Sequence, residues 1–243
     1  MNIRVVFSKA AVMAILLVTA IMVTGSKSSN SQSGEPEMVF VQGGTFTMGY
    51  SNEQGNERGD LEKPAQQVTV SSFYIGKYEV TQAQWMAVMG NNPSRIQGDN
   101  LPVVTVSWVD VQEYIRRLNA ATGKQYRLST EAEWEYAARG GNQSKGYRFS
   151  GSNNLNDVAW QEENSDGAPH AVGTKQPNEL GIYDMSGNVA ELCNNWYDSS
   201  PPVYRGGSWL GDNARQTRPS FRLYITPDRT SSAIGFRLAL SSI

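Results

Sequence analysis

The sequence contains one cysteine, Cys193, and one histidine, His170, among its 243 residues. A disulfide within the chain is excluded because there is no second thiol. A zinc cage of cysteines and histidines needs about four such ligands and is excluded as well. Any catalytic triad would have to use His170, and an iron site made of three histidines is impossible. The composition therefore excludes much of the usual machinery of hydrolases and metalloenzymes.

A large excess of positive or negative charge is also lacking, since the formal net charge is −2. Nucleic acids favour basic surfaces, so a nucleic-acid partner is not expected. Hydrophobic residues make up 39% of the chain, which is enough apolar material for a core. Six tryptophans, eleven tyrosines and 23 glycines predict many turns, with large rings packed on glycine backbone.

The N-terminus carries a short basic stretch, residues 4–9, and then an apolar run over residues 10–23. This run is shorter than the about 20 residues that span a bilayer. Small residues, Val23 and Gly25, stand where a signal peptidase would recognise the chain. The pattern is typical of a secretory signal peptide over residues 1–25, and a retained membrane anchor is the alternative.

Residues 26–37 are polar and rich in serine, which predicts a flexible linker. No internal repeat or further linker is visible after it, so we expect one domain over residues 38–243. We therefore expect an exported protein, periplasmic or extracellular, with no membrane span after the signal peptide is removed.

Three helices are predicted over residues 82–89, 108–121 and 131–139. Each follows a hydroxyl residue that can accept hydrogen bonds from free amides, and each ends at a glycine that permits a left-handed exit. Short strands are expected over residues 38–49, around a turn at Gly43, and over residues 67–78. Helical periodicity ends at Gly141, so the remainder should consist of loops and short strands.

Seven segments follow one another in a characteristic order: VQGGTFTMG (41–49), KYEVTQAQW (77–85), PVVTVSW (102–108), YRLSTEAEWEYAARG (126–140), PNELGIYDMSGNV (177–189), RGGSW (205–209) and GFR (235–237). Together they resemble the formylglycine-generating enzymes, or sulfatase-modifying factors, over nearly all of residues 38–240. The resemblance implies an α+β variant of the C-type-lectin-like fold with little regular secondary structure.

The founding enzymes of this family oxidise a cysteine of a sulfatase to formylglycine and hold Cu(I) with two cysteines. Thiolates suit Cu(I) because both are soft. The resemblance places these cysteines at Gly211 and at about Gln216, and Ser208 matches a serine near the oxygen site. Because neither position holds sulfur, copper is not expected. Cys193 is better interpreted as a small core side chain.

Two other branches of the family use different chemistry. Sulfoxide synthases resemble this scaffold but hold iron with histidines of an additional helical domain, and this chain has neither. Periplasmic maturation enzymes of siderophore pathways lack the copper cysteines and are compatible with export. No residue of this sequence is specific to that branch.

The resemblance also implies calcium, held by side chains of Asp184 and Glu191 and by the carbonyls of Gly187 and Val189. Oxygen ligands from a tight turn suit Ca²⁺, although such acids can instead cap turns. A weaker second pair is Asn156 and Asp166.

Six arginines lie in the last 40 residues: Arg205, Arg215, Arg218, Arg222, Arg229 and Arg237. They can bind a carboxylate or sulfate ligand, but structural ion pairs are the favoured interpretation. A candidate ligand pocket combines Ser208 and Trp209 with three of these arginines, namely Arg215, Arg218 and Arg222.

Two functions stay open. In the first, the chain is an exported, non-catalytic module that binds or assembles a protein, peptide or glycan partner through the surface around residues 208–222. In the second, it is an oxidoreductase without the copper pair, acting on a peptide or small molecule, so the sequence does not decide whether it is an enzyme.

Overall fold

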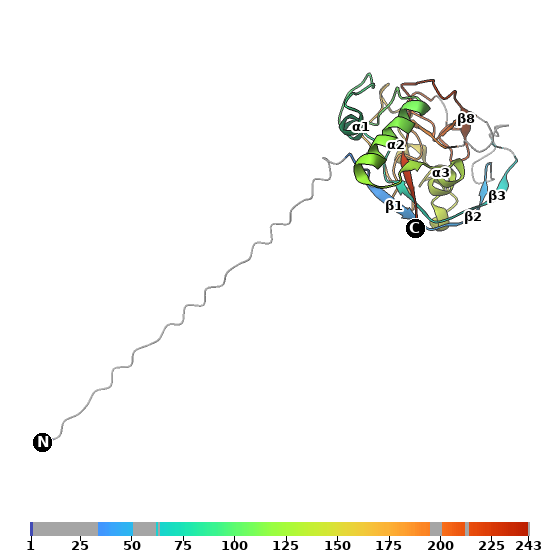
Figure 1. The fold of residues 1–243 in the computed structure, drawn as a ribbon. Coiled ribbons are helices and arrows are strands. Elements are labelled where there is room, and N and C mark those ends of the chain that lie inside the picture. Colours follow the sequence, from blue (N-terminus) through green and yellow to red (C-terminus); the bar gives the residue numbers. More distant parts are fainter. Residues whose placement is uncertain (2–33, 51–61, 63, 195–200, 212–213, 243) are drawn as a thin grey trace.

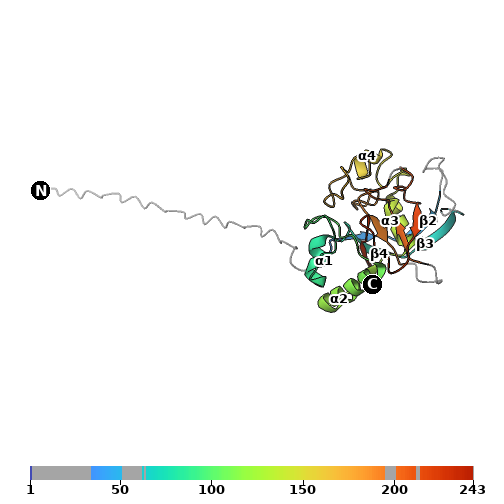
Figure 2. The same ribbon diagram turned by 90° about the horizontal axis from the view of Figure 1, so that it is seen from above.

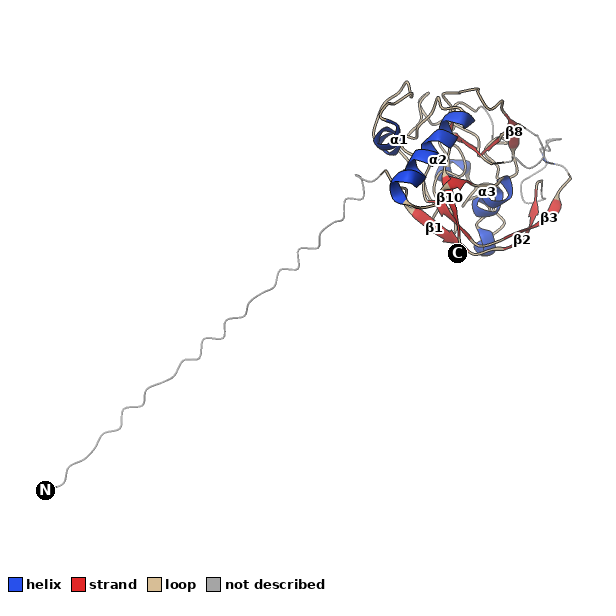
Figure 3. Ribbon diagram, viewed as in Figure 1, coloured by secondary structure: helices blue, strands red, loops and turns tan. Residues whose placement is uncertain are grey.

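The computed structural model describes residues 1, 34–50, 62, 64–194, 201–211 and 214–242. The expected signal peptide and most of the expected linker lie outside the described residues. In the part that is described, no helix is both long and apolar enough to cross a membrane. Loops account for most of the described residues, with short helices and strands between them (Figure 3). This mixture agrees with the predicted α+β class with little regular secondary structure.

Ten short strands form three small sheets within the described residues. The first sheet has the order β1-β4-β10-β5, with β1 Met38–Val41, β4 Phe73–Gly76, β10 Leu238–Ser241 and β5 Arg127–Leu128. The second pairs β2 Gly44–Met48 with β3 Gln66–Val70. The third has the order β8-β7-β6-β9, with β8 Arg222–Tyr224, β7 Val203–Arg205, β6 Ala190–Leu192 and β9 Ile234–Gly235.

The two strands expected around Gly43 do not pair with each other. Instead β1 pairs with β4 and β2 pairs with β3, so one antiparallel ribbon bends at Gly43 and Ser72. The amide of Gly43 donates to Oγ of Ser72 over 3.0 Å. A Cβ atom on Gly43 would lie 2.6 Å from the carbonyl oxygen of Val70. Glycine is therefore required here by the close crossing of the two strands.

The three predicted helices are present as α1 (Gln82–Met89), α2 (Trp108–Thr122) and α3 (Glu131–Ala138). Thr81, Ser107 and Thr130 each accept a hydrogen bond from the third helical amide and complete a capping box. Helices α1 and α2 lie along one side of the molecule (Figure 1). The short α4 (Leu155–Val158) lies on the opposite side (Figure 2).

An aromatic cluster joins the helices to the strands. Trp85 of α1 stacks on Tyr114 of α2 at a centroid distance of 5.2 Å, and Phe236 meets Tyr114 edge-on at 5.4 Å. All three rings are buried. The predicted apolar face of α2 packs here, since Val111, Ile115 and Leu118 are buried, and Trp108 contacts the cluster while partly exposed. The core thus sits between the α1–α2 pair and the sheets.

The region after Gly141 is organised by buried charges as much as by apolar contacts. Arg205, Arg218 and Arg237 are among the largest fully buried side chains. Arg237 pairs with Glu191, and Arg218 pairs with Glu62. Structural ion pairs, the favoured interpretation of the six arginines, are therefore found for these three buried ones.

Replacing Arg237 by methionine should lower the free energy of unfolding by about 3–5 kcal/mol, because it leaves buried carboxylates without their cation. Urea unfolding followed by circular dichroism measures this loss. Arg116 of α2 pairs with Glu113 on the exposed surface, so Arg116→Met is the control and should change stability little. Equal losses for the two variants would contradict this account of the core.

Candidate functional site

The base of the candidate site is a buried carboxylate clamped by two elements of the core. Nε and Nη2 of Arg237 each donate to a Glu191 carboxylate oxygen over 2.6 Å. Nε1 of Trp134, from helix α3, donates to Oε2 of Glu191 over 2.6 Å. The remaining donors of Arg237 bind the carbonyls of Gly76 and Tyr183 at 2.9 Å. Glu191 is thereby held by two parts of the chain that are distant from it in sequence.

Two further buried carboxylates lie beside this pair. Glu79 and Asp184 are both almost completely buried. The charges of Glu191 and Arg237 affect the pKa values of both carboxyl groups. Burial raises the pKa of Asp184 from 3.8 to about 6, against the opposing effects of the Gly173 amide and Arg237. Burial also raises the pKa of Glu79 well above its ordinary value, and the neighbouring carboxylate of Asp184 adds to this. One arginine therefore faces three acids, and protons or a cation are needed to balance them.

Asn188 connects this cluster to the surface. Its side-chain amide donates to Oε2 of Glu79 over 2.6 Å, while its Oδ1 accepts from the amide of His170 over 2.9 Å. Its carbonyl accepts from the amide of Trp209 over 2.7 Å. Asn188 has a φ of 58°, in the left-handed region that asparagine tolerates better than most residues. A single buried residue thus positions two surface loops, one through its side chain and one through its backbone carbonyl.

Those two loops and two further segments line a cavity of about 370 Å³. Trp209 forms one wall, and its Nε1 donates to the carbonyl of Ser232 over 3.2 Å. The lining residues from the other loops are Arg95, Ile96, Val104, Gly167 and Pro169. Oγ of Ser165 donates to the carbonyl of Trp209 over 3.1 Å and holds two walls together. The cavity is therefore mostly apolar and preformed.

The structure brings together Gly211 and Gln216, the two positions at which the sequence resemblance places the family's copper cysteines. A Cβ atom built on Gly211 would lie 2.8 Å from Oε1 of Gln216. Gly207 makes this approach possible, because it has a φ of 68° and a Cβ atom there would meet the carbonyl of Gln216 at 2.8 Å. Ser208 is buried nearby, and its carbonyl accepts from the amide of Gly211. These residues offer no sulfur atom, so they do not fit Cu(I).

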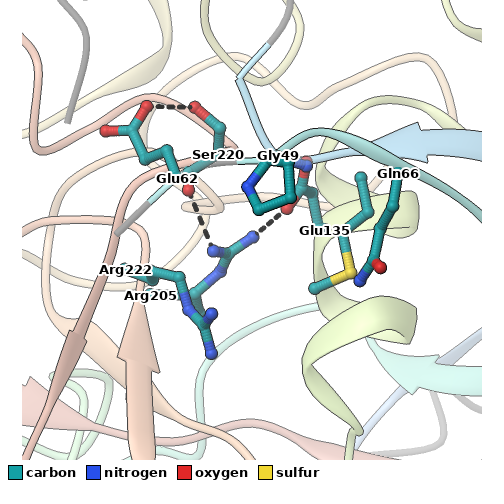
Figure 4. A pocket seen from close by; sticks show the side chains of 9 residues that line it. Gly49, Glu62, Gln66, Glu135, Arg205, Ser220 and Arg222 are labelled. Atoms are coloured by element: carbon teal, nitrogen blue, oxygen red, sulfur yellow. Dashed lines mark hydrogen bonds and ion pairs between the residues drawn. The ribbon is translucent and has the colours of Figure 1, made fainter. Parts of the chain in front are cut away.

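The five residues of the candidate ligand pocket do not share one cavity. Trp209 lines the cavity just described, whereas Arg222 lines a second cavity of about 210 Å³ with Arg205 and Glu135 (Figure 4). Arg222 also pairs with Glu131 at 2.6 Å. Arg218 is fully buried and donates to both oxygens of Glu62. Arg215 is 41% exposed, with its guanidinium over the ring of Phe221.

Figure 4 shows Arg205 directed toward Glu135, with Glu62 and Ser220 to the other side of the second cavity. Arg205 is fully buried and ion-pairs with Glu135 and Glu131. It also donates to the carbonyls of Ser220 and Pro219. This cavity is thus bounded by charges that already neutralise one another.

The remaining residues singled out from the sequence have separate places. Oδ1 of Asn156 accepts from Asn164, and Asp166 is exposed in a turn at a φ of 53°. His170 is partly exposed, with its ring stacked on Trp160 at 3.7 Å and Nε2 against the carbonyl of Ser165. Cys193 is completely buried in an apolar cluster, and burial raises its thiol pKa well above the ordinary value.

For calcium, the predicted ligands fit in part. Oδ2 of Asp184 accepts from the Gly173 amide over 2.6 Å, while its buried Oδ1 has no hydrogen-bond partner among the described residues. An orphaned, buried carboxylate oxygen suits a cation. Both oxygens of Glu191, however, already accept from Arg237. In the described part of the chain no group of three metal-binding side chains is found, and calcium stays a prediction.

Comparison with known proteins assigns this arrangement to a family. Residues 24–242 match the sulfatase-modifying factor enzyme 1-like domain. The chain belongs to this family. A solved family structure, that of PvdO from Pseudomonas aeruginosa, superposes with a TM-score of 0.74 and 29% identity. The superposition covers 87% of this chain and 97% of the other, which confirms the expected fold.

Relatives with differing descriptions match the chain at sequence identities between 28% and 34%. The "Chaperone protein LppX" of Paenibacillus barcinonensis is 34% identical, over 80% of this chain and 86% of its own length. The mouse formylglycine-generating enzyme is 28% identical, over 84% of this chain and 74% of its own length. A mouse "Inactive C-alpha-formylglycine-generating enzyme 2" is also 28% identical, over 86% and 87% of the two chains. The family thus includes members whose names mark them as inactive or as chaperones.

Sequence reasoning missed Glu79, Asn188, Arg95 and Ile96 as parts of this site. Glu79 and Asn188 lie inside two of the seven characteristic segments. The sequence thus identified the two segments but not the hydrogen bond between Asn188 and Glu79. Arg95 and Ile96 lie in a loop without a distinctive motif. Their proximity to Trp209 arises only from the fold.

The contribution of Asp184 to the stability of the protein should fall as the pH rises from about 4 to about 6. Because the pKa of Asp184 is raised in the folded state, the folded chain binds more protons than the unfolded chain in this window. Asp184→Asn should flatten the slope. Urea unfolding at several pH values, with a chelator present, measures it. Asp99→Asn, at an exposed carboxylate, is the control, and an unchanged slope for Asp184→Asn would contradict the assignment.

Calcium should raise the melting temperature at neutral pH, where Asp184 has lost its proton, because binding to the folded state alone adds stability. Scanning calorimetry with calcium or with chelator tests this, and Asp184→Asn should remove the difference. Identical melting curves for the wild type in the two conditions would rule out calcium at Asp184 and Glu191.

Proposed function

We propose that this chain is an exported member of the sulfatase-modifying factor family that binds a segment of another protein in the Trp209 cavity. In this proposal it does not carry out copper-dependent formylglycine formation, and its role is to assist the assembly or folding of its partner. The proposal is carried by one observation, the approach of Gly211 to Gln216 at the place of the copper cysteines.

The chemistry of that place argues against the oxidase. Cu(I) needs soft thiolate ligands, whereas glycine offers no ligand there and glutamine only a hard amide oxygen. The lone thiol of the chain, Cys193, cannot substitute, because it is completely buried among the apolar side chains of another cluster. Ser208 keeps its hydroxyl near this position, but a hydroxyl alone does not hold Cu(I). The scaffold is therefore retained without its metal ligands.

The neighbouring cavity has the properties of a binding site. Its volume of about 370 Å³ lies at the lower end for ligand pockets and suits one or two large side chains. Ile96 is 42% exposed at its wall, and Leu210, next to Trp209, is 56% exposed. Exposed apolar side chains beside a preformed hollow support a protein-binding role. Because Asn188 fixes two of the walls, little ordering is needed on binding.

The names of the relatives support the same non-catalytic function. A relative named as a chaperone matches 80% of this chain, and another relative is named as inactive. Export is supported by the basic and apolar pattern of the N-terminal 25 residues, which fits a signal peptide. An assembly function outside the cytoplasm combines these observations with the loss of the copper ligands.

Oxygen uptake with a cysteine-containing peptide and added Cu(I) should stay at the background rate. The matched variant carries Gly211→Cys and Gln216→Cys, whose side chains should lie close enough to bind one Cu(I) or to form a disulfide. Thiol titration and copper analysis of this variant show whether the two positions are paired. Copper-dependent uptake by the wild-type protein would contradict the proposal, and a variant with neither copper nor disulfide would refute the assignment of Gly211 and Gln216.

A further inference from the structure

The Trp209 cavity carries a charge that nothing in the described chain neutralises. Arg95 is exposed and is the only charged residue among the described residues that line the cavity. Within the described ranges it forms no ion pair or hydrogen bond. Other arginines of the structure differ in this respect, since Arg218 pairs with Glu62 and Arg222 with Glu131. The guanidinium of Arg95 is thus available to an occupant.

The rest of the lining is apolar around this cation. Ile96 follows Arg95 directly, while Val104, Pro169 and the indole of Trp209 complete the apolar walls. A ligand that fills such a hollow presents an apolar side chain, and a guanidinium beside it selects a carboxylate. A purely apolar ligand would leave the cation without a partner, and a basic ligand would be repelled by it.

We infer that the occupant is an extended protein segment in which an apolar side chain enters the cavity and a neighbouring Asp or Glu pairs with Arg95. This inference rests on the proposed binding function and gives the partner its chemistry. Arg95 is then a specificity-determining residue, because it discriminates acidic from basic segments while the apolar walls hold both.

A second charge near the cavity bears on the orientation of the segment. Asp166 is exposed and directly precedes Gly167, which also lines the cavity. Asp166 and Arg95 do not form an ion pair within the described structure. The negative charge of Asp166 disfavours a second carboxylate near Gly167, so the acidic residue of the partner lies toward the loop that carries Arg95.

Fluorescence polarisation with labelled hexapeptides tests this inference on the full chain. The probes are GSLESG, GSLKSG and GSSESG, which differ in the acidic or the apolar residue. The wild-type protein should bind GSLESG several-fold more tightly than either other peptide, and the preference over GSLKSG should weaken as NaCl is raised, because an exposed pair is screened by salt. Arg95→Glu should reverse the preference between GSLESG and GSLKSG. Lys145→Glu makes the same change of charge at an exposed site outside the cavity and should leave the preference as it is.

The outcomes separate the inference from the proposed function. Equal binding of GSLESG and GSLKSG by the wild type, or an unchanged preference in Arg95→Glu, would overturn acidic selection while peptide binding stands. Binding that survives in Leu210→Ser and Trp209→Phe but is lost in Arg95→Glu would also overturn it, because the charge alone would then be responsible. Absence of binding for all three peptides would overturn the inference together with the binding function on which it rests.

Discussion

The ion pair between Arg237 and Glu191 is the interaction on which the rest of this structure depends. It lies at the centre of a domain with little regular secondary structure, where the backbone alone offers few ladders of hydrogen bonds. Arg237 reaches the carbonyls of Gly76 and Tyr183 as well as Glu191, and Glu191 in turn accepts from Trp134. Strand β6, strand β4, helix α3 and the loop before Asp184 are therefore tied to one buried charge pair.

The same cluster extends to the surface through polar contacts that can be followed one by one. Glu79 holds the side chain of Asn188, and Asn188 holds the backbone of His170 and Trp209. The cavity at Trp209 is thereby coupled to a group of acids whose protonation is shifted by burial. A scaffold of this kind keeps its surface loops in place even where the residues on them have changed. It explains how the family fold persists here although Gly211 and Gln216 stand where the resemblance places the sulfur ligands.

The sequence predicted the local features of the fold well and the non-local ones poorly. Helices α1, α2 and α3 begin where Thr81, Ser107 and Thr130 predict, because a capping box involves only residues three apart. The pairing of β1 with β4 was missed, since a turn signal at Gly43 reveals a change of direction but not the partner of each strand. The apposition of Gly211 and Gln216 followed from the family resemblance, whereas the place of Arg95 beside Trp209 depends on loops more than 100 residues apart.

The central claim is that this scaffold has lost its soft metal site and works through its surface. Equilibrium competition for Cu(I) between the purified wild-type protein and a chromophoric chelator tests it most directly. The account predicts that the protein withdraws no copper from the chelator, because glycine and glutamine replace the two thiolates. Withdrawal of one Cu(I) per chain would contradict it.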